Sequence, residues 1–217
     1  MPEARGGRAP HGLMGGGGYV PRFRNLDRRE KNFIRGYAYD FGSGGTPNPK
    51  YIPKYGEPLL KELADVSGAG FDLTTMGTVL PRFEHGVRIN PDVKDAWGIP
   101  TLHITQKYTD NEYEMAKDSM NVAEEICRGA GFEILAKHYQ MVPPGESIHE
   151  LGTCRMGADP KTSVLNPFNR AHDVPNLYVM DGSSFVSGGV QNPTLTILAL
   201  AMRASEHLAE QLRQGNI

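Results

Sequence analysis

Two polar residues, His149 and Asn192, have the types and surroundings that oxidation of an alcohol would need. His149 opens the run His-Glu-Leu-Gly-Thr-Cys-Arg-Met-Gly, and Asn192 stands 43 positions later in the run Gln-Asn-Pro-Thr. A neutral imidazole accepts a hydroxyl proton near neutral pH, and an asparagine amide can hold the hydroxyl oxygen without titrating. The pair therefore fits removal of a proton from an alcohol while its carbon loses a hydride.

The residues around this pair favour a flavin as the hydride acceptor. Pro193 suits the first position of a helix over 193–213, with Asn192 before it as an N-cap type. A helix start is partly positive and would stabilise the anionic edge of a reduced flavin. Gly152 and Gly157 would let the backbone approach a flat ligand.

Each of these residues also has a purely structural explanation. Asn192 can serve only as the N-cap, His149 can be a half-buried histidine with its hydrogen bonds satisfied, and the run Asp181-Gly182-Ser183 can be a plain turn. In the helix, an apolar stripe indicates a core face, made of Leu195, Leu198, Met202, Leu208 and Leu212. The first half of that helix is apolar on nearly every side, so we expect it to be buried inside something larger.

The composition limits the class of protein. The 217 residues allow one large or two small domains, and 39% hydrophobic with 22% charged residues is typical of a globular chain. A net charge of −2 gives no argument for a nucleic-acid partner. No run approaches the ~18 apolar residues of a membrane span. The histidines and the two cysteines show no metal-ligand spacing, and no GxSxG motif is present.

The pattern along the chain predicts an α+β fold. Strands are expected over 19–24, 33–41, 73–80, 85–90, 101–108 and 132–139, and helices over 58–67 and 110–128. Residues 1–18 are glycine-rich and predict a flexible loop. From residue 146 the pattern changes to a strand over 176–180, a loop and the long helix. Asp181 would thus stand at the end of a strand, where cofactor hydroxyls or amides are often met.

Three separated blocks resemble the C-terminal signature of the glucose–methanol–choline (GMC) family of flavin oxidoreductases. They are HELGTCRMG, NLYVMDGSSF and QNPTLTILALAMRASEHLAEQL, and the resemblance covers residues 146–213. It is greatest to the sugar-oxidising branch, with its pyranose oxidase-type and gluconate dehydrogenase-type enzymes, which has asparagine in the NPT block. The resemblance implies that residues 1–145 belong to an antiparallel-sheet substrate-binding domain. Residues 146–217 would be the C-terminal segment of an α/β FAD-binding domain.

The resemblance also implies a role for each site residue. His149 would be the catalytic base, and Asn192 would be its partner at the substrate hydroxyl. Asp181 and Gly182 would touch the ribityl or pyrophosphate part of FAD. At the flavin ring edge the resemblance places Pro193 and Thr194. The substrate would be a sugar or another alcohol, oxidised at a CH–OH group.

One family motif is missing from this sequence. Family members begin with a strand, a GxGxxG turn and a helix that hold the ADP part of FAD. Here Pro47 stands where Gly42 and Gly44 would need the third glycine, and Leu73 stands there for Gly68 and Gly70. We therefore expect the C-terminal part or a split subunit of an enzyme, which needs a second chain carrying the GxGxxG half. The alternative is a non-catalytic binding or assembly subunit that keeps the fold; a cytoplasmic and a periplasmic location both remain open.

Overall fold

The computed structural model describes residues 17–45, 53–66, 70–139, 141–146 and 149–217. It contains helices and antiparallel sheets, which confirms the predicted α+β class. The chain forms two compact units, one of Met1–Gly77 with Tyr113–Gln140 and the other of Thr78–Glu112 with Met141–Ile217. The assignment of residues 1–145 and 146–217 to a substrate-binding and an FAD-binding domain stays a prediction. The flexible loop predicted over 1–18 lies almost wholly outside the described residues.

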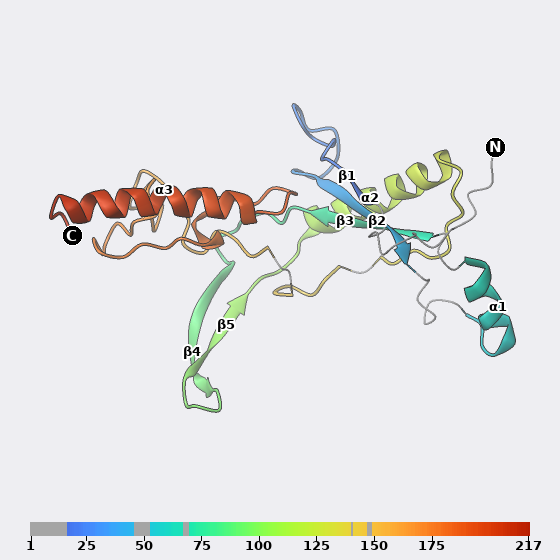
Figure 1. Cartoon of the computed structure of the whole chain (residues 1–217), viewed down its shortest axis with the longest axis horizontal. Helices are drawn as coiled ribbons and strands as arrows, with labels where there is room; N and C mark the ends of the chain where they lie inside the picture. The colour runs from blue at the N-terminus through green and yellow to red at the C-terminus, as the bar shows by residue number, and fades with distance from the viewer. Residues whose placement is uncertain (1–16, 46–52, 67–69, 140, 147–148) are drawn as a thin grey trace, which may run out of the picture. The chain divides into compact units, whose positions relative to one another are not determined.

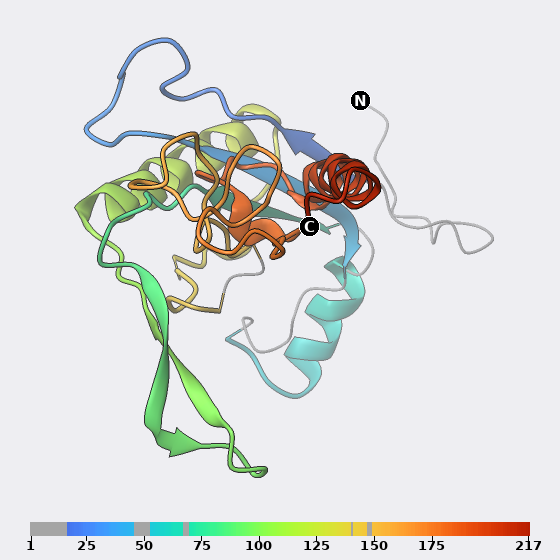
Figure 2. The same ribbon diagram turned by 90° about the vertical axis from the view of Figure 1, so that its left-hand side faces the viewer.

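The first unit contains an antiparallel sheet of order β1-β2-β3 (Figure 1 and Figure 2). Its elements are β1 (Gly17–Val20), β2 (Tyr37–Gly45), α1 (Glu57–Val66), β3 (Gly70–Gly77) and most of α2 (Asp110–Gly129). Alternate residues of a strand face the same side, so Tyr37 and Tyr39 both enter the core. There they pack with Phe33 and with Met115 and Val122 of α2.

The hydroxyl groups of two core tyrosines form hydrogen bonds from the sheet to α2. Tyr37 Oη donates to Asp118 Oδ2 over 2.6 Å, and Tyr39 Oη donates to the Ser119 carbonyl over 2.6 Å. Burial, together with the hydrogen bond to Asp118, raises the pKa of Tyr37 to about 12. Both tyrosines therefore stay neutral donors in the folded protein.

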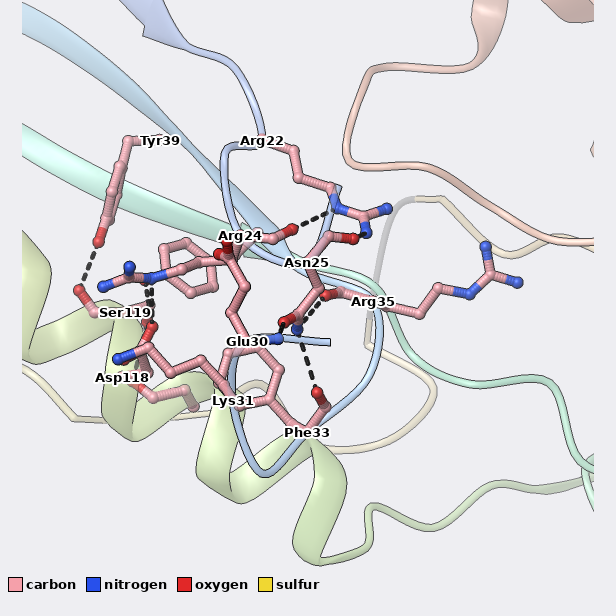
Figure 3. A network of polar contacts seen from close by, with 12 residues as sticks. Arg22, Arg24, Asn25, Glu30, Lys31, Phe33, Arg35, Tyr39, Asp118 and Ser119 are labelled. Carbon is pink, nitrogen blue, oxygen red and sulfur yellow. Dashed lines mark hydrogen bonds and ion pairs between the residues drawn. The ribbon is translucent and has the colours of Figure 1, made fainter. Parts of the chain in front are cut away.

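The loop between β1 and β2 is held by Asn25, which is buried and adopts a left-handed backbone conformation with φ 51° (Figure 3). Its Nδ2 donates to the carbonyls of Phe33 (3.0 Å) and Arg35 (2.9 Å), and its Oδ1 accepts from the Glu30 N–H (2.8 Å). An asparagine tolerates this backbone better than most residues, and here its side chain satisfies three groups of the loop.

Asp118 connects the same loop to α2 (Figure 3). Its carboxylate lies 3.0 Å from Arg24 Nε and 3.1 Å from Lys31 Nζ, in addition to the bond from Tyr37. Burial opposes the charged form, but hydrogen bonds from Tyr37, Lys31 and Arg24 and the charge of Arg24 lower the pKa of Asp118. The loop and the helix are thus joined by charge as well as by packing.

The second unit begins with a two-stranded antiparallel hairpin, β4 (Gly86–Lys94) and β5 (Pro100–Thr105). Glu112, which is 1% exposed, closes its base. The carboxylate accepts from the Leu80 N–H (3.2 Å) before β4 and from the Thr109 N–H (2.8 Å) after β5. Arg82 Nη2 lies 3.1 Å from Glu112 Oε2.

The rest of this unit is a long irregular segment that carries the short 3-10 helix η3 (Gly182–Ser184), followed by α3 (Thr194–Arg213). Four of the five residues of the predicted core stripe of α3 are exposed, Leu195 (80%), Leu198, Met202 and Leu212, and only Leu208 is half-buried, so the stripe is not a core face in this chain. The less exposed side contains the buried Ala204 and the half-buried Ile197, Leu200, Ala201 and Leu208. Within the described part of the chain, no helix is long and apolar enough to span a membrane.

Two predicted strands are also wrong. Residues 132–139 form no strand, and residues 176–180 form only an isolated bridge, between Tyr178 and Arg170. Alternating side chains were present in both segments, but a strand also needs a neighbour to complete its ladder. The other predicted strands and helices agree with β1 to β5, α1, α2 and α3 apart from shifted ends.

Candidate active site

The segment that begins at His149 binds along η3 through its backbone. The N–H groups of Gly152, Cys154 and Met156 donate in turn to the carbonyls of Gly182 (3.3 Å), Ser183 (2.9 Å) and Ser184 (2.9 Å). The three donors alternate along a segment that turns at residues 153–154, and the three acceptors are the successive residues of η3. The position of the backbone next to His149 is fixed by these bonds.

Gly182 is the point at which the His149 segment meets the start of α3. A Cβ on Gly182 would lie 2.7 Å from Leu151 Cδ2, 3.3 Å from the Glu150 carbonyl oxygen and 3.4 Å from Ile197 Cδ1. Glu150 follows His149 directly, and Ile197 lies in the first turn of α3. Two segments that are distant in sequence are therefore brought side by side.

Leu151 is the residue of this site that the sequence analysis missed. Its two methyl groups lie against Gly182 and against Gly188, where an added Cβ would be 3.0 Å from Leu151 Cδ1. The sequence did contain a signal for this packing, namely a leucine inside a polar motif and two glycines in the later loop. Gly188 and Gly182 leave room for this side chain, and so set how deeply the His149 segment lies in the unit.

The glycines of the motif are also explained by contacts within the chain. Gly152 has φ +90°, and its Cβ would lie 3.3 Å from the Phe185 carbonyl oxygen. A Cβ on Gly157 would lie 2.8 Å from Ser163 Cβ. Close approach of the backbone is real at both positions, but the neighbour is the protein itself; approach to a ligand stays a prediction.

Asp181 caps η3. Its Oδ1 accepts from the Ser183 N–H over 2.8 Å, and the side chain is exposed. These contacts are those of the plain turn that the sequence analysis gave as the structural explanation of Asp181-Gly182-Ser183. Gly182 beside it is buried. A contact of Asp181 or Gly182 with a cofactor stays a prediction.

Asn192 does not cap α3, which corrects one structural alternative. The helix begins at Thr194, Pro193 occupies the N-cap position with φ −85° and ψ −10°, and no side chain caps this end. Asn192 is exposed, and no described residue forms a hydrogen bond with its side chain. The amide is therefore available to a ligand, and so are uncapped N–H groups of the first turn.

His149 and Asn192 belong to the same compact unit, with His149 half-buried and Asn192 exposed. Pro193 and Thr194 follow Asn192 at the helix start. The junction at Gly182 brings together the segments that carry all six predicted site residues. No group of three or more His, Cys, Asp or Glu residues that could hold a metal ion is present among the described residues.

A cavity of about 590 Å³ lies elsewhere, in the first unit. It opens on the sheet face that carries Asp40, Asp72 and Thr74, opposite the face that Tyr37 and Tyr39 turn to α2. None of the predicted site residues lines it. Its size therefore says nothing about the chemistry of His149 and Asn192.

Comparisons with known proteins identify the family of this chain. The family model for GMC oxidoreductase matches residues 84–201, more than half of the chain. The 2-methyl-1,2-propanediol dehydrogenase of Mycolicibacterium austroafricanum is 31% identical over 92% of this chain and 37% of its own length. The gluconate 2-dehydrogenase flavoprotein of Pantoea cypripedii is 28% identical over 92% of this chain and 35% of its own length.

A third relative, the fructose dehydrogenase large subunit of Gluconobacter japonicus, is 29% identical over 74% of this chain and 29% of its own length. This chain thus spans about a third of the length of the relatives it matches. The matched family region contains the hairpin, η3, the first part of α3 and all six predicted site residues. The chain belongs to the GMC oxidoreductase family.

Proposed function

We propose that this chain supplies the catalytic edge of an FAD-dependent enzyme that oxidises a CH–OH group of a sugar or another alcohol. His149 is the base, and Asn192 holds the hydroxyl oxygen. The relatives support the substrate class, because their names specify a diol, gluconate and fructose. The word flavoprotein in one of these names supports the cofactor.

The chemistry assigned to the chain is a proton transfer with positioning. The substrate hydroxyl donates its proton to a ring nitrogen of His149, while the Asn192 amide donates a hydrogen bond to the oxygen. The C–H bond then breaks as a hydride, and the carbon becomes a carbonyl. FAD, when bound, supplies the acceptor for this hydride.

The residues at the start of α3 fit the ring edge of such a cofactor. The uncapped first turn offers N–H groups and partial positive charge beside Pro193 and Thr194. These favour the negative charge that a reduced flavin carries. Asp181 has an exposed carboxylate for the hydroxyls of the ribityl part. The binding of the ADP part is assigned to the family's remaining polypeptide, as a second chain or another part of the enzyme.

One observation carries this proposal. A Cβ on Gly182 would lie 3.3 Å from the Glu150 carbonyl oxygen, next to His149, and 3.4 Å from Ile197 Cδ1 in the first turn of α3, so both segments approach Gly182 closely. A base and an orienting amide must reach the same hydroxyl, so their segments have to meet. Asn192 supports the same conclusion, because its amide is not used as a cap.

The test uses a chimera in which this chain replaces the matched third of the 2-methyl-1,2-propanediol dehydrogenase. Turnover is measured with that diol, gluconate and fructose, and bound FAD is measured by visible absorbance. His149→Ala should lower kcat about 10²–10⁴-fold, as loss of a general base does, with FAD still bound. Asn192→Ala should lower it about 10²-fold, as loss of a transition-state hydrogen bond does.

The matched control is His103→Ala, which removes an exposed histidine of β5. It should leave both kcat and FAD content unchanged. A His149→Ala chimera that keeps its turnover would remove His149 from its role. If Asn192→Ala were silent as well, the rival function, an assembly subunit without a catalytic part, would be supported instead.

A further inference from the structure

The β4–β5 hairpin has one apolar and one polar face. Cross-strand partners share a face, and Val87 lies opposite Ile104 while Ile89 lies opposite Leu102. On the other face Arg88 lies opposite His103, one position along the same ladder. Ile89 is 68% exposed and Leu102 is 64% exposed. An amphipathic ribbon of this kind is normally buried on its apolar side.

Within its own unit, no described helix or strand covers this face. The two strands pack on each other, as Figure 1 and Figure 2 show, and neither packs extensively on α3 of the same unit. An isolated two-stranded hairpin is marginally stable in water, and it needs a third strand or a packed surface. A contiguous exposed apolar patch usually marks an interaction site.

Hydrogen bonds nevertheless hold both ends of the hairpin. The base is closed by the Glu112 carboxylate. At the tip, Asp95 Oδ1 accepts from the N–H groups of Trp97 and Ile99, each over 2.9 Å. This turn presents Trp97, the single tryptophan of the chain, with 84% of its surface exposed. A pre-ordered, exposed tryptophan is a typical anchor of a protein interface.

The comparisons indicate what covers the face. The GMC family match begins at residue 84 and so includes the whole hairpin. Relatives that contain the matched region are about three times as long as the part that matches. About two thirds of each relative's length lies outside the part that matches this chain, and this polypeptide is the candidate for covering the face.

We infer that the apolar face of the hairpin, with Trp97 at its tip, is the docking surface for the polypeptide that forms the rest of the GMC fold. The face is defined by Val87, Ile89, Leu102 and Ile104. This inference rests on the proposed function for the existence of such a polypeptide. It assigns the contact surface to the hairpin, separately from the chemistry of His149.

The test compares one pair of substitutions in two settings. Ile89→Thr with Leu102→Thr removes apolar surface and leaves a β-branched residue at each of the two ladder positions. In the isolated chain this pair should change Tm by no more than ~2 °C, because the face is already in water. In the chimera it should lower Tm by about 5 °C or more, because two buried side chains are lost. Trp97→Ala should show the same contrast.

The matched control is Arg88→Thr with His103→Thr, the adjacent pair on the polar face. It should be neutral in both settings. Equal small shifts for both pairs in the chimera would overturn the docking surface. Light scattering of the isolated chain checks the rival occupant. If the chain is a dimer, and if Ile89→Thr with Leu102→Thr dissociates that dimer, a second copy is the occupant and the inference is overturned.

Failure of the docking surface is distinguishable from failure of the proposed function. A chimera that oxidises its substrate but shows no difference between the two settings refutes the docking surface alone. A chimera that shows the difference but keeps its turnover after His149→Ala refutes the catalytic proposal alone. A wild-type chimera that does not fold overturns the choice of occupant.

Discussion

Gly182 is the residue on which the geometry of the site depends most directly. Gly182→Ala would place a Cβ 2.7 Å from Leu151 Cδ2 and 3.3 Å from the Glu150 carbonyl oxygen, which is next to His149. We expect a loss of about 1–3 kcal/mol of stability from overpacking. We also expect lower kcat in the chimera, because the His149 segment must move. Urea unfolding and steady-state kinetics measure the two effects.

A second glycine-to-alanine substitution is the control for Gly182→Ala, because it separates the effect of the steric clash from the effect of replacing a glycine. Gly129→Ala adds a methyl group where nothing lies within 4 Å, and should not destabilise the protein. Leu151→Ala removes the atom that the new Cβ meets, so the double variant should lose less stability than the two single losses added together. Strict additivity would contradict the contact.

The residue types indicate a chemistry for His149 and Asn192, which stays a prediction, but they do not indicate how the segments of the two residues are positioned. A histidine that accepts a proton and an amide that orients a hydroxyl can be recognised from their functional groups. The contact of Leu151 with Gly182 and Gly188 cannot, because it joins positions more than thirty residues apart. The capping role given to Asn192 as an alternative was wrong, because Pro193 took that position.

At the scale of elements, the base of the hairpin depends on the charge of Glu112. Burial opposes that charge, but hydrogen bonds from Thr109, the Leu80 N–H and Arg82 lower the pKa of Glu112 below its ordinary value. Because the folded pKa lies below the unfolded one, the stabilisation is present above about pH 4.3. It is lost as the pH falls through the folded pKa.

Glu112→Gln should therefore lower the free energy of unfolding at pH 7 by about 2 kcal/mol, the value of hydrogen bonds to a buried charge. It should also make the loss of stability between about pH 5 and 3 shallower. Urea midpoints across this range test both points. Glu124→Gln, at an exposed carboxylate bound to Lys137 and Arg128, should change little. Parallel acid profiles for wild type and Glu112→Gln would count against the assignment.

The helices were predictable because each carries its own periodic signal, as α2 does over Asp110–Gly129. Strands were less so. Residues 132–139 alternate like a strand but find no partner, and their Phe132 instead packs edge-on against Phe71 at 4.6 Å. The apolar stripe predicted to be the core face of α3 is mostly exposed. Periodicity shows that a helix has an apolar face, but it does not show which element packs on that face.

For the whole molecule, the exposed stripe of α3 and the apolar face of the hairpin lead to the same expectation. Leu195, Leu198 and Met202 on the helix are exposed, although the sequence predicted burial in something larger. The chain also covers about a third of the length of its relatives. Two separate apolar surfaces in one unit are more than a monomeric protein usually leaves in water.

The isolated chain should therefore bind FAD weakly or not at all, whereas the chimera should bind it in a one-to-one ratio. In this chain Pro193 and Thr194 are assigned to the ring edge of the cofactor and Asp181 to its ribityl part, and no residue is assigned to the adenosine. The phosphates and the adenosine contribute much of the polar contact in a dinucleotide site, and those contacts depend on a GxGxxG turn that this sequence lacks. A calorimetric titration of the purified chain with FAD measures this affinity. The His149→Ala chimera is the control, because it should keep the cofactor while losing turnover. Stoichiometric FAD in the isolated chain would show that the binding determinants lie within these 217 residues.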